Sequence, residues 1–298
     1  MAVLVAPTRR QIATRAHARR ARRRRFGRLT LGAAVVAAIA AAVLAGPLFV
    51  PYAPEAQAIA ERLGAPSAAH VLGTDAFGRD VLARLLSGGR VSLTIGLLSM
   101  IVTVAVGVTV GAISGFFGGV ADALLMRLTE LVMVFPTFFL IILVVATFGS
   151  SVPLLVLVIG LTGWPVGARV IRGEVLKVRS RDYVLAARAI GASSWRILAR
   201  HIIPSVLAVI VISATIRVGT NILIEAGLSY LGLGVQPPLA SWGNMIAESA
   251  KTMRTAWWLT AIPAAAIFLA VFGFNLFGEG VRDVVDPRRE RPRGDTAA

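Results

Sequence analysis

The chain of 298 residues contains no cysteine, only three histidines and only two lysines among its 31 basic residues. Without cysteine, it can form no disulfide, thiolate metal site or thiol nucleophile. His17, His70 and His201 are far apart in sequence, and none has a histidine partner three or four residues away, which disfavours a histidine metal site. We therefore expect this chain to hold no metal and no cofactor.

Charged residues are scarce. They make up 15% of the chain, whereas hydrophobic residues make up 56%. A soluble domain carries about a quarter charged residues, so the composition predicts an all-α protein that crosses a membrane several times. The sequence also lacks the GxxxxGK[ST] phosphate-binding loop, so this chain cannot be expected to hydrolyse a nucleotide. Glu225 is the only carboxylate inside a predicted span, and it has no acidic partner there, which argues against an enzyme.

Six apolar runs are long enough to span a bilayer core, which needs about 20 residues. They cover about residues 29–50, 92–116, 131–149, 152–171, 206–228 and 257–277. The first run follows a basic tail, residues 1–28, and is separated from the second by a polar segment, residues 51–91. The remaining runs form one membrane core, residues 92–287, followed by a short tail, residues 288–298.

Basic residues are distributed unequally between the two sides that six spans define. One side holds 24 of them, in residues 1–28, Arg127, residues 169–200 and the tail after 281. The other side, formed by residues 51–91 and 229–256, holds six. Positive residues favour the cytoplasmic side, so we expect both termini in the cytoplasm and residues 51–91 outside it. The net charge of +16 thus follows membrane topology rather than nucleic-acid binding.

The loop between the fourth and fifth runs, residues 182–204, combines helix-forming residues with positive charge. Tyr183–Ile190 predicts a short helix that ends at Gly191, because glycine tolerates the left-handed conformation after a helix. Ser193 or Ser194 can cap a second helix over Trp195–Ile203. Pro204 then begins the next span, since its missing N–H matters little in a first turn.

Three interpretations of this loop are open from the residues alone. Its spacing imitates a DNA-binding helix-turn-helix at Ala187, Gly191 and Ile197, but spans tether it at both ends and no third helix completes a core. It could also be a solvated connector. Ala186, Ala187 and Gly191 favour a third interpretation, because small side chains leave a shallow surface on which another protein can dock.

The loop resembles the EAA loop of binding-protein-dependent ABC transporter permeases. That pattern has Glu-Ala-Ala, then a glycine four residues on, and closes on a proline. This chain has Leu185-Ala186-Ala187, Gly191 and His201-Ile202-Ile203-Pro204, so Leu185 replaces the usual glutamate.

Other segments resemble the C-type subunit of the dipeptide, oligopeptide and nickel permeases. They include His70–Leu82 (HVLGTDAFGRDVL), Gly115–Gly119 with Asp122 and Met126-Arg127, Glu225–Pro238 (EAGLSYLGLGVQPP), Ser241-Trp242-Gly243, and Asn275 through Arg282-Asp283 to Asp286-Pro287. The resemblance covers most of the chain after about residue 68.

The resemblance implies a type I ABC importer permease fold in a bacterial inner membrane. The expected function is ATP-driven import of dipeptides or oligopeptides, with nickel or another small solute as the alternative. The implied partners are a second homologous permease, one or two ATPase subunits that bind ATP and magnesium, an extracytoplasmic binding protein and membrane lipid. A stand-alone channel is disfavoured because the docking loop would be idle. The implied ATPase-docking residues are Tyr183, Ala186, Ala187, Arg188, Gly191, Ala192, Ser193, Trp195, His201 and Pro204.

Polar residues also occur inside the fifth run. Arg217, Asn221 and Glu225 are spaced by four and share one helix face. At 1.5 Å per residue from Pro204, Arg217 lies roughly 20 Å into the bilayer and Glu225 roughly 30 Å. Ionisable residues at such depth usually face a cavity or a partner. We expect these three residues to line the translocation path or its outer gate; the alternative is a structural pair at the interface between the two permeases.

Two further patterns are found in and around the second run: one lies within it and the other precedes it. Gly107, Gly111 and Gly115 recur every fourth residue and predict a smooth face for close helix packing. Asp80–Leu86 alternates charged and apolar residues at helical spacing. The residues alone leave open whether that segment lies on the membrane surface or meets the binding protein.

Overall fold

The computed structural model describes residues 9–285, with side chains from residue 27 to residue 284. Within this part the regular secondary structure is helical, and the described residues form no β-strand. The predicted tail at 288–298 lies outside the described residues, and of the tail at 1–28 mainly the backbone from Arg9 onward is described. The all-α prediction is confirmed.

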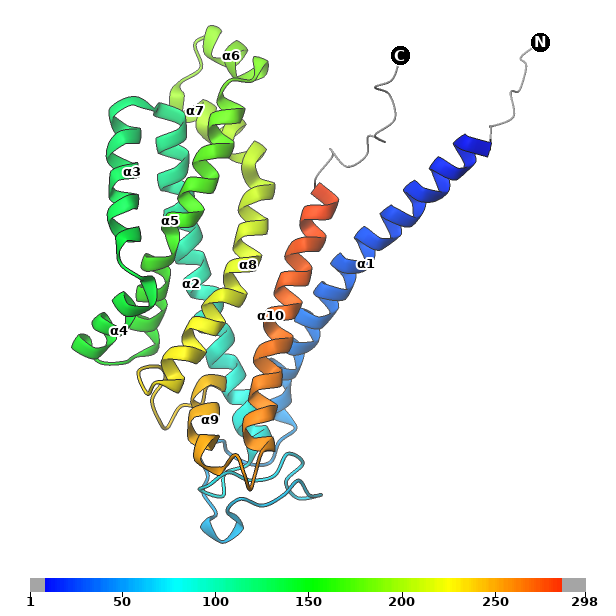
Figure 1. The fold of residues 1–298 in the computed structure, drawn as a ribbon, viewed down its shortest axis with the longest axis vertical. Coiled ribbons are helices and arrows are strands. Elements are labelled where there is room, and N and C mark those ends of the chain that lie inside the picture. Colours follow the sequence, from blue (N-terminus) through cyan, green and yellow to red (C-terminus); the bar gives the residue numbers. More distant parts are fainter. Residues whose placement is uncertain (1–8, 286–298) are drawn as a thin grey trace.

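Ten α-helices follow one another within the described residues (Figure 1). They are α1 (Arg9–Ala45), α2 (Val81–Phe117), α3 (Gly119–Val134), α4 (Thr137–Phe148), α5 (Val152–Arg179), α6 (Asp182–Ala189), α7 (Ser194–Ile197), α8 (Ile203–Tyr230), α9 (Trp242–Ser249) and α10 (Trp258–Val285). A π-helical turn, Leu198–Ile202, joins α7 to α8 without a break.

Five helical stretches in the described residues are long and apolar enough to cross a membrane: Gly27–Leu48, Val81–Phe117, Val152–Arg179, Ser194–Tyr230 and Trp258–Val284. The pair α3 and α4 passes the same test when taken together, although the two helices are bent by 76°. Six spans are therefore present if this bent pair counts as one, in agreement with the number expected from hydropathy.

The boundaries predicted for the third span are wrong. Residues 131–149 were expected to form one helix, but the chain breaks at Phe135-Pro136 and α3 begins already at Gly119. Proline lacks the N–H that continues a helix, and its ring disfavours helical geometry in the residue before it. Phe135 accordingly has extended backbone angles, φ −85° and ψ 129°.

The second span also differs from its prediction, because α2 begins eleven residues before residue 92. The side chain of Asp80 accepts a hydrogen bond from the backbone N–H of Ala83 at 2.7 Å and so caps the first turn. The segment Asp80–Leu86 therefore belongs to a helix packed inside the protein, with Arg84 only 3% exposed, and does not lie on the membrane surface.

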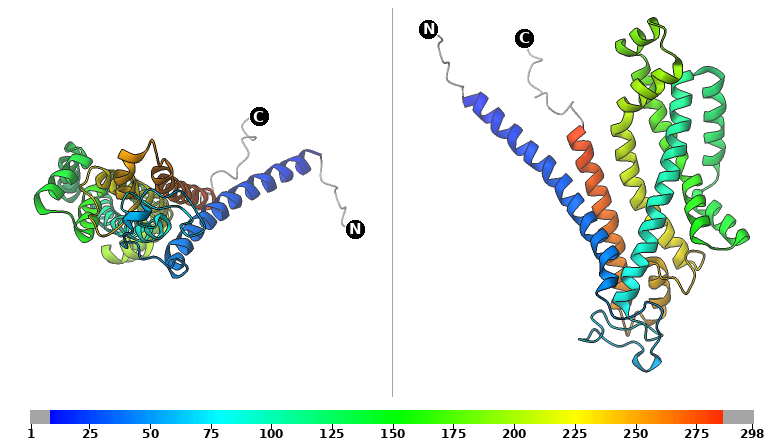
Figure 2. Two further views of the ribbon diagram at one scale, coloured as in Figure 1. Left: turned by 90° about the horizontal axis from the view of Figure 1, so that it is seen from below. Right: turned by 180° about the vertical axis from the view of Figure 1, so that it is seen from behind.

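The helices form an elongated bundle whose two ends differ (Figures 1 and 2). Helices α6 and α7 project at one end, called here the loop end. The chain between α1 and α2, together with α9, covers the other, called here the α9 end. Helix α1 begins and α10 ends on the side of the loop end, and these two helices pack against each other along the edge of the bundle.

The bundle centre is the close packing of α2 against α5. The glycine face predicted on α2 lies on α5: a Cβ atom at Gly107 would come 3.2 Å from the carbonyl oxygen of Trp164, and one at Gly115 would come 2.9 Å from that of Arg172. At Gly111 a Cβ would lie 3.0 Å from the Cβ of Ile171 and closer still to a backbone carbonyl. The glycines let two backbones approach without intervening side chains.

This packing predicts different outcomes for two glycine-to-alanine substitutions. Gly111→Ala should destabilise the chain by about 1–3 kcal/mol, because the added methyl group meets backbone that cannot move aside. Gly173→Ala, on α5, is the matched control, because a Cβ there has no atom within 4 Å. The free energy of unfolding of each variant can be measured in detergent. Equal stability of the two variants would contradict backbone contact at Gly111.

Candidate functional site

The loop between α5 and α8 contains two helices joined by a tight turn, as the sequence predicts, but the second helix, α7, continues through the π-helical turn into α8 without a break. Gly191 has a positive φ of 81°, and the N–H of Ala192 donates to the carbonyl of Ala187 at 3.1 Å, which closes the end of α6. Ser193 caps α7 by accepting a hydrogen bond from the N–H of Arg196 at 3.4 Å. Pro204 lies in the first turn of α8.

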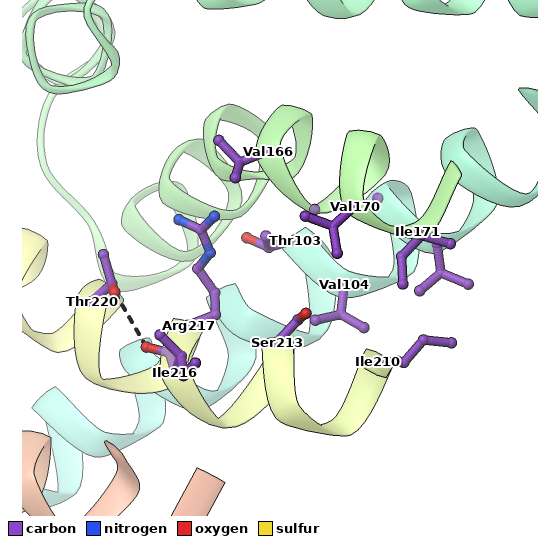
Figure 3. A pocket seen from close by; sticks show the side chains of 13 residues that line it. Thr103, Val104, Val166, Val170, Ile171, Ile210, Ser213, Ile216, Arg217 and Thr220 are labelled. Atoms are coloured by element: carbon purple, nitrogen blue, oxygen red, sulfur yellow. Dashed lines mark hydrogen bonds between the residues drawn. The ribbon is translucent and has the colours of Figure 1, made fainter. Parts of the chain in front are cut away.

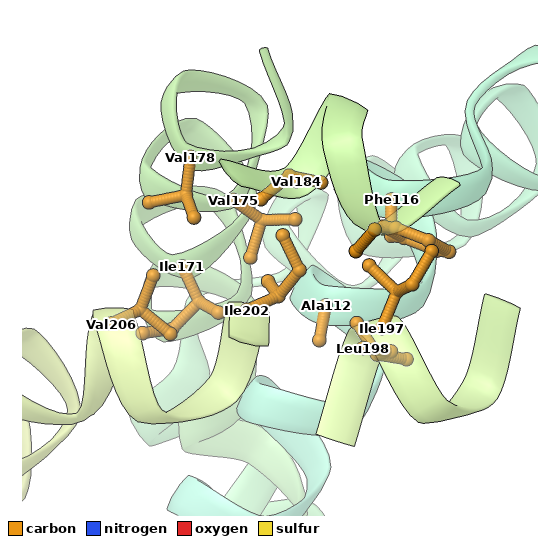
Figure 4. Close-up of a cluster of buried hydrophobic side chains, with 11 residues drawn as sticks. Ala112, Phe116, Ile171, Val175, Val178, Val184, Ile197, Leu198, Ile202 and Val206 are labelled. Atoms are coloured by element: carbon orange, nitrogen blue, oxygen red, sulfur yellow. The ribbon is translucent and has the colours of Figure 1, made fainter. Parts of the chain in front are cut away.

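One face of this loop is part of the protein core (Figure 4). Val184, Ile197 and Ile202 are completely or almost completely buried. They pack with Ala112 and Phe116 of α2 and with residues of α5 that include Ile171, Val175 and Val178. The inner face of the loop is therefore packed against α2 and α5.

Polar and aromatic contacts hold the same loop from its sides. The Tyr183 hydroxyl lies 3.0 Å from that of Ser205, which donates in turn to the carbonyl of His201. The Trp195 ring packs edge-on against Phe117, with centroids 5.3 Å apart. These contacts join α6 to the start of α8 and α7 to the end of α2.

The opposite face of the loop exposes large apolar side chains. Ile190 is 85% exposed and Trp195 is 63% exposed, and Tyr183 and Leu185 are each about half exposed. Such side chains on a polar loop that is fixed in place are characteristic of a protein-binding surface. We call Tyr183, Leu185, Ile190 and Trp195 the apolar loop face.

The structure divides the predicted docking residues into two groups. Ala187 lies in the core at 8% exposure, so its small side chain serves packing within the chain, and Ala192 and His201 are half-buried. Seven are exposed: Tyr183, Ala186, Arg188, Gly191, Ser193, Trp195 and Pro204. Leu185 and Ile190 were missed as surface residues. Their signal was the helical spacing of Val184 and Ala187, which turns the neighbouring residues outward.

An ion pair fixes the helices beneath the loop. Arg172 on α5 donates two hydrogen bonds, each 2.6 Å, to the carboxylate of Asp122 on α3, and Ser114 on α2 donates a third at 2.6 Å. Arg179 donates to the last carbonyls of α2, those of Gly115 and Phe116. Three helices thereby meet at one point, and this arrangement could not be predicted from sequence.

A groove of about 250 Å³ lies between α2, α5 and α8 (Figure 3). Its walls are mainly apolar, and Arg217 is the one charged side chain among the residues that line it: Thr103, Val104, Gly107, Val108, Val166, Gly167, Val170, Ile171, Ile210, Ser213, Ile216, Arg217 and Thr220. The side chain of Arg217 reaches from α8 toward α5. The structure thus gives Arg217 a cavity to face.

Glu225 and Asn221 do not line this groove, although they share a helix face with Arg217. Glu225 is completely buried and accepts hydrogen bonds from Ser92 of α2 at 2.9 Å and from Ser229 at 2.7 Å. Ser92 also accepts from the backbone N–H of Trp242 at the start of α9. Glu225 therefore joins α2, α8 and α9 within this chain, and its predicted place along a path or gate has no support from this geometry.

Asn221 is also completely buried, and its amide nitrogen and oxygen have no hydrogen-bond partner among the residues that the structure describes. It lies one helical turn from both Arg217 and Glu225.

At the α9 end, the segment before α2 is held by charged groups. Arg84 donates to Asp75 at 2.6 Å and to Glu248 of α9 at 2.7 Å, and Arg79 pairs with the same two carboxylates.

His70 lies between two further acids, with its ring nitrogens 2.8 Å from Asp80 and 3.0 Å from Glu61. The hydrogen bond with Asp80, helped by Glu61, raises the pKa of His70 above its ordinary 6.5, although partial burial opposes the shift.

Comparison with known proteins shows a match to one family over most of the membrane core. Residues 107–291 match the family described as binding-protein-dependent transport system inner membrane component. A Brucella suis protein named as a peptide permease is 42% identical over 250 residues, which is 83% of each chain. The glutathione transport system permease protein of Pectobacterium atrosepticum is 41% identical over 75% of this chain and 74% of its own. The oligopeptide transport system permease protein of Haemophilus influenzae is 41% identical over 74% and 70%.

The contacts of His70 predict how the segment before α2 responds to pH. Because its pKa is raised in the folded chain, the ion pairs of His70 contribute stability below about pH 6.5 and lose it as pH rises through the folded pKa. Hydrogen exchange at the backbone of residues 61–80, corrected for its intrinsic pH dependence, should therefore accelerate as pH rises from about 6 to about 9. In His70→Gln this dependence should be lost; the same dependence in both proteins would contradict the assignment.

Proposed function

Because the chain belongs to the inner membrane components of binding-protein-dependent transport systems, we propose that it is the permease subunit of an ATP-driven importer of dipeptides and oligopeptides. The observation that carries the proposal is the loop between α5 and α8, whose inner face is packed in the core while its outer face exposes four large apolar side chains. Such a loop can transmit the motion of an attached subunit to the helices that it is packed against.

Peptides are the favoured substrates because the relatives reported above are named for peptides, oligopeptides and glutathione, which is itself a tripeptide. These names favour peptides over nickel. In this assignment the chain supplies half of the translocation path, and a second homologous permease supplies the other half. An extracytoplasmic binding protein delivers the peptide.

Energy is supplied by partner ATPase subunits, which bind ATP and magnesium, since the sequence of this chain has no phosphate-binding loop. The apolar loop face, together with Ala186, Arg188, Gly191 and Ser193, sits in a cleft of an ATPase subunit. When the ATPases close on ATP, α6 and α7 move together with the buried side chains beneath them. Val184 and Ile197 pass that movement to α2 and α5, and the π-helical turn passes it to α8.

The arrangement also sets a topology. The loop end faces the cytoplasm of a bacterial cell, and the α9 end with residues 51–80 faces outward. The unequal distribution of basic residues supports this orientation, because the four regions that carry 24 of them are expected on one side of the membrane. Both termini of the chain are then cytoplasmic.

Reconstituted vesicles test the transport assignment directly. The complete complex should accumulate a labelled dipeptide only when ATP is present on the side of the membrane where the ATPase subunits lie and the binding protein is present on the opposite side. If the dipeptide equilibrates across the membrane when both ATP and the binding protein are omitted, the complex is a channel and the assignment is contradicted.

The docking assignment predicts the effect of one charge on the apolar loop face. Ile190→Asp should leave folding and membrane insertion unchanged, because Ile190 is 85% exposed, but it should reduce retention of the ATPase subunit about tenfold, since an unpaired charge would be buried on docking. Retention is measured by co-purification from membranes, and peptide uptake should fall with it.

Ile59→Asp is the matched control for this experiment. It changes the same residue type to the same charge at a position that is 68% exposed, but at the α9 end. It should keep full ATPase retention. Normal co-purification and uptake of Ile190→Asp would show that the ATPase docks elsewhere.

A further inference from the structure

Arg217 is a cation without a counter-ion in the part of the chain that the structure describes. No carboxylate of the described residues lies within 4 Å of its guanidinium, whereas Arg79, Arg84 and Arg172 all have one. Arg217 is also only partly exposed and lies on a membrane-spanning helix. A charged group at such depth is unfavourable unless an anion or water compensates it.

The polar groups beside Arg217 do not supply that compensation. Thr103 donates its hydroxyl hydrogen to the carbonyl of Gly160 at 3.0 Å, and Thr220 donates to that of Ile216 at 3.2 Å. The guanidinium instead lies close to the backbone of Gly163, which has no side chain: a Cβ atom built on Gly163 would lie 3.5 Å from Nη1 of Arg217. The five donors of the guanidinium are thus directed into a groove whose walls are mainly apolar.

We propose that Arg217 binds the C-terminal carboxylate of the peptide as it passes through the groove, a role that rests on the function proposed above. A guanidinium and a carboxylate match each other in charge and in their paired hydrogen-bonding geometry. The apolar walls, including Val104, Val166 and Val170, then contact the adjacent side chain of the peptide. Because every unmodified peptide ends in a carboxylate, one arginine serves substrates of different sequence.

The competing counter-ion is an acidic side chain of the partner permease. The geometry favours the peptide, because Arg217 leans across a hollow of about 250 Å³ toward α5 instead of away from the bundle. The free end of a peptide is narrow enough to enter such a hollow. An acidic side chain of the partner would be attached to a helix about 10 Å in diameter, which is harder to accommodate there. Arg217 therefore determines specificity for an anionic chain end.

The charge in the groove can be measured without transport, because the chain has no natural cysteine. Ser213→Cys places a thiol on the groove wall one helical turn from Arg217. Its reaction rates with negatively charged sulfonatoethyl and positively charged trimethylammoniumethyl methanethiosulfonate are compared in the assembled complex in membranes. The ratio of the anionic to the cationic rate should fall about tenfold when Arg217→Gln is added, because one nearby unscreened charge is removed.

Two controls accompany this measurement. Arg217→Lys keeps the positive charge and should keep the ratio. Ile210→Cys lies on the same groove but two helical turns from Arg217, so its ratio should change less. A ratio at Ser213→Cys that is unaffected by Arg217→Gln would mean that a partner acid already neutralises the arginine, and would overturn the proposal.

Uptake then tests the ligand itself. Uptake is measured for a dipeptide with a free C-terminal carboxylate and for the same dipeptide with a C-terminal amide. For each peptide, uptake by the variant is divided by uptake by the wild type, so that any preference of the binding protein for one of the two peptides cancels. Arg217→Gln should reduce uptake of the free acid about tenfold and leave that of the amide nearly unchanged, since a charge-assisted pair is lost only with the acid.

Equal losses for the two peptides would overturn the carboxylate assignment and leave Arg217 as an interface residue. If the wild-type complex imports neither peptide in an ATP-dependent way, the proposed function fails. The thiol ratio would still report whether Arg217 presents an unpaired charge.

Discussion

The contact of α2 with α5 is the constraint on which the rest of the structure depends. Gly107, Gly111 and Gly115 bring the two backbones together, and the same pair of helices forms two walls of the groove. Both helices also provide the apolar residues that receive the loop between α5 and α8. A change in their separation would therefore reach the groove and the loop together, because α2 and α5 contribute residues to both.

Polar groups between the helices join particular parts of the bundle. At the loop end, the Asp122–Arg172 pair joins α3 to α5, with Ser114 of α2 as a third member. Toward the α9 end, Glu225 joins α8 to α2 through Ser92. Hydrogen bonds between helices are favoured where lipid offers no alternative partner, so these groups hold the bundle at two levels. The groove with Arg217 is in neither network.

The groove differs from the rest of the interior in whether its polar groups have partners. The carboxylates of Asp122, which is half-buried, and Glu225, which is buried, have their partners within this chain. Arg217 has no ion-pair partner and the Asn221 amide no hydrogen-bond partner among the residues that the structure describes. Residues that satisfy one another support a fold, and residues left unpaired inside it more often serve a ligand or a partner. The spacing of Arg217, Asn221 and Glu225 could not distinguish these two situations, since all three are equally placed on one helix face.

The sequence by itself determined the class of protein, the number of spans and the two-helix loop. Each of these follows from local patterns: apolar runs of bilayer length, a glycine that allows positive φ at 191, and a serine cap at 193. The family followed from motifs that are also local. Only the tertiary structure decided that Ala187 faces the core, and that Glu225 is held by serines while Arg217 faces a groove. These outcomes depend on partners such as Ser92 and Glu225, 133 residues apart, and the chain brings them together only when its helices pack.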